Sequence, residues 1–209
     1  MSARGLVIFF AVLLGGAAWL EADRVHHPPP GVAVPETPKQ GPPHGPPTGW
    51  PLADGAVATA LATYHIHARV LSACHYHYDA GAKYAPVDLA LGWGRMSDWA
   101  VYDPLGVTQR GRFYLYSWGP GGPPIPRREI ETHSANNHIV PADATVQGVL
   151  RAVRLNDLVS IDGSLVEIRA PAGFLWRSSL TREDTGGQSC ELIRATRIAI
   201  EPSDRRWSW

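Results

Sequence analysis

The sequence predicts a mainly β domain of the α+β class, with one or two short helices, built as a small antiparallel OB-like barrel. A curled sheet carrying the helix on one face is the alternative. Apolar and polar residues alternate with a period of two over residues 63–70, which is typical of a half-buried strand. Further short strand-like runs follow, with glycine at the turns between them. An apolar segment at the N-terminus predicts a preceding membrane helix.

The later strands are expected at residues 111–119, 157–168, 173–180 and 190–200. The run 157–168 fits either a single strand or a hairpin turning at Asp162-Gly163. One helix is expected over residues 142–154, because Val146, Val149, Leu150 and Val153 follow the spacing of one helix face. Asp143 is placed to cap its first turn. Shorter helical turns are expected after Pro86 and after Pro126.

The first residues indicate export from the cytoplasm. Fifteen uncharged, mostly apolar residues run from Leu6 to Leu20, behind Arg4, and residues 3–22 are long enough for a membrane span. A signal peptide cleaved near Gly16 is the alternative, because small residues occur there. The positive charge at Arg4 keeps the N-terminus inside. We therefore expect a single-pass protein of the bacterial inner membrane facing the periplasm or exterior, or a periplasmic protein after cleavage.

A proline-rich segment follows, and it sets the expected domain boundaries. Residues 28–51 contain ten prolines and four glycines, and proline removes backbone donors, so no part of this segment is expected to join a sheet. The expected organisation is a signal anchor or signal peptide at 1–24, a linker at 25–53, a β-rich domain at 54–202 and a mobile tail at 203–209. The linker is interpreted as a stalk.

The charge balance limits the partners. The chain has 19 basic and 19 acidic residues, so it carries no net field to attract a polyanion. We therefore expect no nucleic-acid binding, and the expected partners are the inner membrane, through residues 3–22, and an envelope protein or small ligand. We expect no cofactor. Neither a G-x-S-x-G nucleophile motif nor an H-E-x-x-H zinc motif is present, which gives no support to a hydrolase of those types.

Two His-x-His pairs surround Cys74 and raise the question of a metal site. In one straight strand the pairs at 65/67 and 75/77 would lie about 26 Å apart, since a strand rises about 3.3 Å per residue. His65 and His67 remain weak metal candidates, because two ligands on one strand face need further partners. A solvated polar strand face is the favoured interpretation. Cys74 and Cys190 either form a disulfide in an oxidising compartment or remain free thiols.

The run "HSANNH" supplies the catalytic candidates His133, Asn136 and His138, in a segment expected to be a loop. Histidine acts as a base near neutral pH, and asparagine stabilises an oxyanion. A hydrolase-like enzyme, metal-assisted or not, would need these histidines to converge on a carboxylate. The carboxylates considered are Asp88, Asp98 and Asp184. The alternative is that the polar residues lock a loop through backbone hydrogen bonds.

Ligand-binding candidates occur in two other runs. Trp93 and Trp99 stand beside glycines and suit a groove for a ring, a sugar or a peptide, although they suit core packing equally. Arg177 and Arg182 stand among hydroxyl residues and suit a carboxylate or phosphate, although a salt-bridged turn explains them as well.

Four runs in order resemble a family of bacterial exported or membrane-anchored proteins of uncharacterised activity. They are "APVDLALGWGRMSD" (85–98), "HSANNHIVPAD" (133–143), "DGSLVEI" (162–168) and "WRSSLTREDTGGQSCEL" (176–192). The sequence motifs that characterise the family are ALGWGxMSD, HSANxHxxPA and WRSSLTRxDTG. The resemblance covers most of residues 60–200 and carries over no catalytic or ligand-binding residue. We therefore expect an envelope accessory or binding module, with the hydrolase-like enzyme as the alternative.

Overall fold

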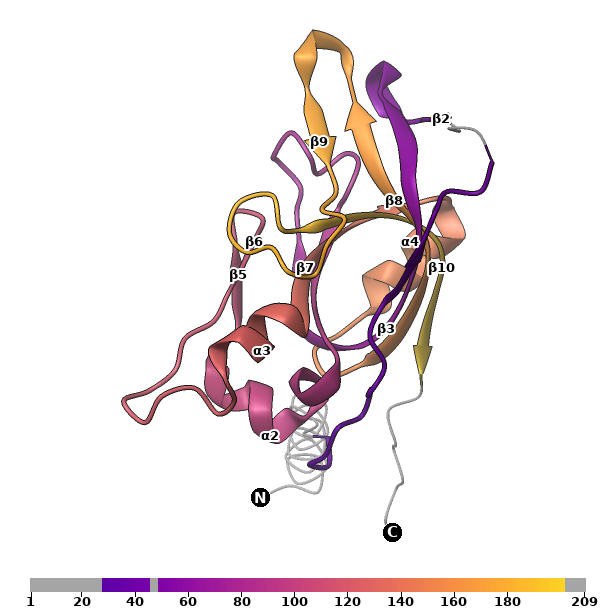
Figure 1. Ribbon diagram of the computed structural model, residues 1–209. Helices are drawn as coiled ribbons and strands as arrows, with labels where there is room; N and C mark the ends of the chain where they lie inside the picture. The colour runs from indigo at the N-terminus through magenta and orange to yellow at the C-terminus, as the bar shows by residue number, and fades with distance from the viewer. Residues whose placement is uncertain (1–27, 46–48, 202–209) are drawn as a thin grey trace, which may run out of the picture.

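The computed structural model describes residues 28–45 and 49–201 (Figure 1). The predicted membrane segment at 3–22 and the predicted tail at 203–209 lie outside the described residues. Within the described ranges, no helix has the length and apolar character needed to cross a membrane.

Most of the described chain is in strands, as predicted. The strands are β1 (Lys39–Gly41), β2 (Gly49–Pro51), β3 (Val57–His75), β4 (Val87–Gly92), β5 (Thr108–Arg110), β6 (Phe113–Leu115), β7 (Ser134–Pro141), β8 (Leu158–Arg169), β9 (Leu175–Arg177) and β10 (Glu191–Glu201). The helices are α2 (Trp99–Tyr102), α3 (Arg127–Thr132) and α4 (Ala144–Ala152), with 3-10 turns η1 (Ala53–Gly55), η2 (Gly94–Ser97), η3 (Asp103–Leu105) and η4 (Pro171–Gly173).

Five strands close into a barrel. The order runs β3-β4-β7-β10-β8, and β8 pairs again with β3, so the sheet returns to its first strand (Figure 1). The sheet is mixed, which corrects the prediction of an antiparallel one: β7 and β10 pair in parallel, and the other four barrel pairings are antiparallel. The parallel pair arises because the chain passes through α4 and β8 before β10 returns beside β7.

The long strand β3 makes this closure possible. Its first part pairs with β8 and its last part with β4, so one strand serves two neighbours. The register shifts once between Ala60 and Ala62 and again between Val70 and Ser72. Such bulges bend a strand and raise its local twist, as a small barrel requires. The single strand at 63–70 predicted from alternation is therefore confirmed, and it is longer than expected.

The barrel interior is apolar. Its core includes Ile66, Leu89, Ile139, Ile161 and Ile193, one from each barrel strand, all with no exposed surface. On β4 and β7, the residues next to these core positions therefore point to the outside of the barrel. Helix α4 packs against β10 and β7 and adds Val146 and Leu150 to the same core.

The proline-rich segment does join the sheet, so that expectation was wrong. Strands β1 and β2 both pair with β3, each through three residues. Val34 is fully buried in the barrel core, and its amide donates to Ser97 Oγ at 3.0 Å. Among the described prolines of this segment, Pro51 ends β2 and the others lie outside β1 and β2, where they remove no ladder hydrogen bond. Residues 28–45 and 49–53 therefore pack on the barrel as part of the domain.

Two local expectations were wrong and three were confirmed. The residues after Pro86 form the buried strand β4, and the run "HSANNH" enters strand β7. Of the two alternatives for residues 157–168, the single strand is confirmed, since β8 continues through residues 162–163 without a hairpin. The helix α4 and its Asp143 cap are confirmed, since Asp143 Oδ1 accepts from the Val146 amide at 2.9 Å. The helical turn after Pro126 is confirmed as α3.

Gly163 is required because the backbone of the neighbouring strand β10 comes very close to it. A Cβ atom at Gly163 would lie 2.1 Å from the Arg194 carbonyl oxygen, a backbone atom that cannot move alone. We expect Gly163→Ala to lower the free energy of unfolding by about 1–3 kcal/mol, as overpacking does. Urea denaturation followed by circular dichroism measures this change.

Gly148→Ala is the matched control, because Gly148 lies in α4 and a Cβ there meets nothing within 4 Å. Alanine favours a helix over glycine, so this variant is expected to match or exceed the parent in stability. Equal stability of the two variants would contradict the close approach of the β10 backbone to Gly163.

Candidate functional site

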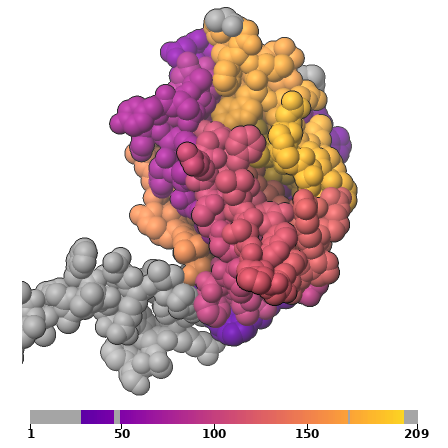
Figure 2. Space-filling model, turned by 90° about the vertical axis from the view of Figure 1, so that its left-hand side faces the viewer, coloured from indigo at the N-terminus to yellow at the C-terminus, as the bar shows by residue number. Residues whose placement is uncertain are grey.

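A pocket of about 380 Å³ lies beside the start of β7, and we call it the loop pocket. Four segments line it: residues 113–116, the face of α3 that carries Arg127 and Glu131, the first residues of β7 (134–136), and the loop 181–191. Figure 2 shows the face on which the yellow loop before β10 meets the pink segments of β6 and α3. The pocket therefore forms where the β8–β10 connection meets the long insertion between β4 and β7.

Aromatic residues form one wall of the loop pocket. Tyr114 and Tyr116 have ring centroids 5.4 Å apart, and Trp118 continues the series with a centroid 6.1 Å from that of Tyr116. Phe113 and Leu115, on the other face of the same strand, are 50% and 49% exposed. Exposed apolar side chains gathered beside a pocket are typical of binding sites.

Two ion pairs also line the loop pocket. Arg127 Nε donates to Glu131 Oε1 at 2.7 Å. Arg182 Nη2 lies 2.7 Å from Glu191 Oε1, and Arg182 Nη1 donates to Tyr64 Oη at 2.8 Å. Burial raises the pKa of Glu191 to about 7, although the Arg182 charge opposes that rise. Arg182 therefore links the β8–β10 loop to strand β3 of the barrel.

The Cys190 thiol also lines the loop pocket, but it is a poor nucleophile. Burial and the nearby Glu191 carboxylate raise the pKa of Cys190 to about 12, so the thiol stays protonated. Cys74 and Cys190 are both free thiols in the structure, and they lie in or beside strands that do not pair with each other.

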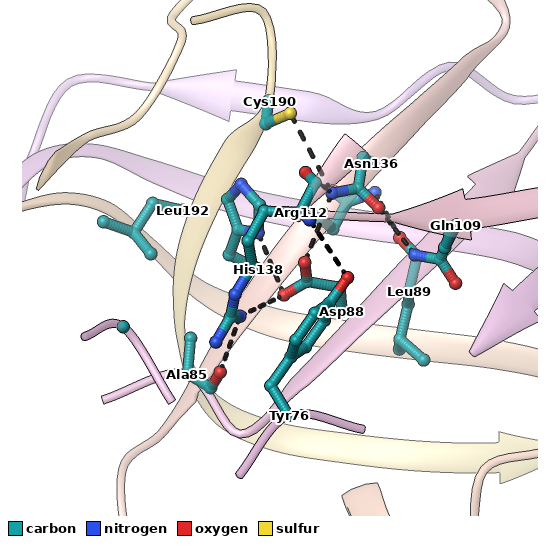
Figure 3. A network of polar contacts seen from close by, with 12 residues as sticks. Tyr76, Ala85, Asp88, Leu89, Gln109, Arg112, Asn136, His138, Cys190 and Leu192 are labelled. Carbon is teal, nitrogen blue, oxygen red and sulfur yellow. Dashed lines mark hydrogen bonds and ion pairs between the residues drawn. The ribbon is translucent and has the colours of Figure 1, made fainter. Parts of the chain in front are cut away.

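A second polar group, which we call the Asp88 cluster, consists of Asp88, Arg112, Asn136 and His138 (Figure 3). The Asp88 side chain is fully buried on the outer face of β4, where Arg112 Nη1 donates to its Oδ1 at 2.8 Å. His138 Nδ1 lies 2.9 Å from the same oxygen. Two cationic or donor groups thus face one buried carboxylate, as a buried charge requires.

Arg112 is the centre of the Asp88 cluster. Its guanidinium lies 3.8 Å from the centre of the Tyr76 ring and also donates to the Ala85 carbonyl at 2.8 Å. Its Nη2 donates to Asp79 at 2.8 Å. Burial favours the neutral Asp79 carboxyl, but the hydrogen bonds and charge of Arg112 outweigh it and lower the Asp79 pKa. Sequence reasoning missed Arg112, for which the turn glycine before it was the only local signal.

The two candidate histidines do not converge. They are five residues apart along an extended chain, which corresponds to about 16 Å. His133 lies at the end of α3, where its ring packs against Trp93 with centroids 6.4 Å apart and its Nδ1 contacts the Glu129 carbonyl. His138 is buried beneath Trp176, with ring centroids 4.6 Å apart.

The candidate carboxylates are also separated. Asp88 meets His138 but is fully buried, Asp98 caps α2 by accepting from the Ala100 amide, and Asp184 accepts from Ser179 Oγ at 2.7 Å. No described carboxylate is therefore seen to meet both histidines. The geometry needed for the hydrolase-like site is not assembled.

The loop pocket collects four of the predicted site residues: Trp93, Asn136, Arg182 and Asp184. The other two ligand-binding candidates lie elsewhere. Trp99 packs against the apolar cluster beneath α2, and Arg177 on β9 donates to Glu167 at 2.7 Å. Asn136 joins the two sites, because it lines the pocket while its Nδ2 donates to the Arg112 carbonyl at 3.0 Å.

The metal candidates on β3 are paired with carboxylates. His65 Nδ1 lies 2.6 Å from Asp162 Oδ1, and His67 Nε2 lies 2.9 Å from Glu201 Oε1. Within residues 28–45 and 49–201, no three histidine, cysteine or acidic side chains converge in a way that would hold a metal ion.

Comparison of this chain with protein-family models, with curated proteins and with solved structures gives no match. The functional argument therefore depends on the geometry of the loop pocket and of the Asp88 cluster.

The Asp88 cluster predicts a large stability loss when its cation is removed. We expect Arg112→Met to lower the free energy of unfolding by roughly 3–5 kcal/mol, because it leaves Asp88 buried without its arginine partner. Methionine is no more strained than arginine at the positive φ of 70° found here, so lost pairing dominates. Urea denaturation of the two proteins measures the difference.

Lys83→Met is the control, because Lys83 forms an exposed ion pair with Asp54 at 2.6 Å. Exposed pairs contribute little, so this variant is expected to unfold close to the parent. Similar midpoints for the two variants would argue against a structural role for Arg112.

Proposed function

We propose that this chain is an exported, membrane-tethered cell-envelope binding module whose ligand site is the loop pocket. The observation that carries this proposal is the pocket itself, which combines an aromatic wall with polar and charged side chains. Small-molecule sites commonly combine an apolar wall with a few convergent polar groups.

We further propose that the barrel is of the OB type. Three features support this assignment: the strand order β3-β4-β7-β10-β8, the helix between the third and fourth barrel strands, and the parallel pairing of the third and fifth. OB folds bind ligands beside their second and third strands, with help from the connection between the fourth and fifth. The loop pocket uses the third strand, β7, and that connection.

The proposed export depends on the N-terminal sequence. The fifteen uncharged residues from Leu6 to Leu20 follow a basic residue, as in signal anchors and signal peptides. The resemblance to exported or membrane-anchored bacterial proteins points the same way.

Alkaline phosphatase fused after Trp209 is expected to be active, because this enzyme requires the periplasm. If only a reporter that works in the cytosol is active when fused after Trp209, the proposed export is contradicted.

The hydrolase-like alternative has weaker support. Among the predicted catalytic histidines, His138 meets a candidate carboxylate, Asp88, but their side chains are 4% and 0% exposed. A substrate would have to displace Trp176 to reach His138, and the one thiol of the adjoining pocket is held protonated. The pair is better explained as support for the barrel wall.

The binding proposal predicts that filling the loop pocket abolishes binding. Gly187 lines the pocket and a Cβ there meets nothing within 4 Å, so Gly187→Trp is expected to fold normally and occupy the space. The probes are three phenyl-bearing compounds, phenethylamine, 3-phenylpropanamide and 3-phenylpropionate, added to the full chain in lipid nanodiscs. Saturation-transfer NMR, with empty nanodiscs as the blank, measures binding.

Gly119→Trp is the control, because Gly119 also has open space around it and does not line the loop pocket. At least one probe should bind the parent and Gly119→Trp but not Gly187→Trp. If Gly187→Trp binds every probe as well as the parent does, the loop pocket is not the ligand site. The same conclusion follows if no protein binds any probe.

A further inference from the structure

The loop pocket contains more acidic than basic side chains. Arg127 and Arg182 are the basic residues that line it, while Glu131, Asp184 and Glu191 are the acidic ones. Two cations against three carboxylates leave one negative charge when all the groups are ionised. A protonated amine entering this pocket would therefore meet a favourable potential, and an anion would meet an unfavourable one.

Both arginines already have carboxylate partners. Arg127 is paired with Glu131, and Arg182 with Glu191 and the Tyr64 hydroxyl. Arg182 Nε and Nη2 have no hydrogen-bond partner among the described residues, although Nη2 lies 2.7 Å from Glu191 Oε1, and an anion accepting from either nitrogen would lie beside the Glu191 carboxylate. The arginines therefore serve to hold the loop, and they do not provide the carboxylate or phosphate site that their type alone suggested.

The Glu191 carboxylate also has an unused acceptor. Glu191 is 1% exposed, and its Oε2 has no hydrogen-bond partner within the part of the chain that the structure describes. A buried carboxylate oxygen without a donor is costly, so its presence in a pocket wall calls for a partner. Asp184, in the loop that covers Glu191, accepts from Ser179 Oγ through Oδ2 and adds a second negative charge nearby.

The aromatic wall suits the same ligand. Phe113, Tyr114 and Tyr116 line the loop pocket together with the acidic residues. Aromatic faces attract cations and also bury apolar surface. A ligand that places its charge beside the carboxylates and its apolar body on this wall would use both features of the pocket.

We propose, on the basis of the proposed binding function, that the loop pocket takes a ligand carrying a protonated amine on an apolar or aromatic body. The amine donates to Glu191 and Asp184, and the body packs on the aromatic wall. Arg182 shifts from the Glu191 carboxylate as the amine takes its place, and remains bonded to Tyr64.

The three phenyl probes test the charge preference, because they share a body and differ in charge. Phenethylamine is expected to bind the full chain in nanodiscs roughly tenfold or more tightly than 3-phenylpropanamide, and 3-phenylpropionate most weakly. Titrations followed by saturation-transfer NMR at pH 8, where Glu191 is ionised and the amine is charged, give the affinities.

Glu191→Gln and Asp184→Asn are each expected to remove most of the preference for the amine. Glu183→Gln is the matched control: Glu183 lies in the same loop, pairs with Arg128 and does not line the pocket, so the preference should survive. Circular dichroism verifies that each variant folds.

The outcomes separate the two proposals. Tighter binding of the amide or the propionate, blocked by Gly187→Trp, overturns the amine proposal and leaves the binding module standing. An amine preference that Glu191→Gln and Asp184→Asn both leave unchanged, or that Glu183→Gln removes equally, also overturns the amine proposal. If none of the probes binds, both proposals fail.

Discussion

The structure depends on one buried ion pair between Arg112 and Asp88. Asp88 lies on the outer face of β4 with no exposed surface, so its charge is tolerable only with a cation beside it. Arg112 comes from the turn between β5 and β6, far along the insertion that follows β4. By reaching Asp79, Ala85 and Asp88 together, its guanidinium joins the β3–β4 connection, the barrel wall and the insertion.

This constraint also shapes the loop pocket. The residues directly after Arg112 form the aromatic wall, so fixing the arginine fixes where Phe113 to Tyr116 stand. On the other side, the Arg112 carbonyl holds Asn136, whose Oδ1 accepts from Gln109 Nε2 at 2.7 Å. Asn136 then stands at the pocket edge with no freedom to turn. The pocket is therefore built on a rigid support, as a preformed binding site requires.

The sequence predicted those elements whose signal is local. Strand β3 alternates over residues 63–70 and α4 has one apolar face with an aspartate cap, so each could be recognised within a short window. Strands β4 and β7 were missed because both of their faces are buried, and the outer face holds polar residues that resemble a loop. The partner that makes Asp88, Asn136 and His138 acceptable in a strand is Arg112, and no local pattern indicates that contact. Four residues of the loop pocket were named as catalytic or ligand-binding candidates from the sequence. Their convergence could not be predicted, because it results from closure of the barrel.

The two polar clusters differ in one respect that bears on function. In the Asp88 cluster the buried carboxylate is met by both Arg112 and His138, and a ring from β9 covers the histidine. In the loop pocket the buried carboxylate of Glu191 keeps one oxygen without a donor, and its single cation comes from a surface loop. A carboxylate whose two oxygens both have donors, as in Asp88, stabilises a wall, whereas a carboxylate with one oxygen left without a donor beside a pocket leaves interaction energy for a ligand. The same chemistry, a buried acid facing an arginine, thus has a structural role on one side of β7, and on the other side we propose a role in recognition.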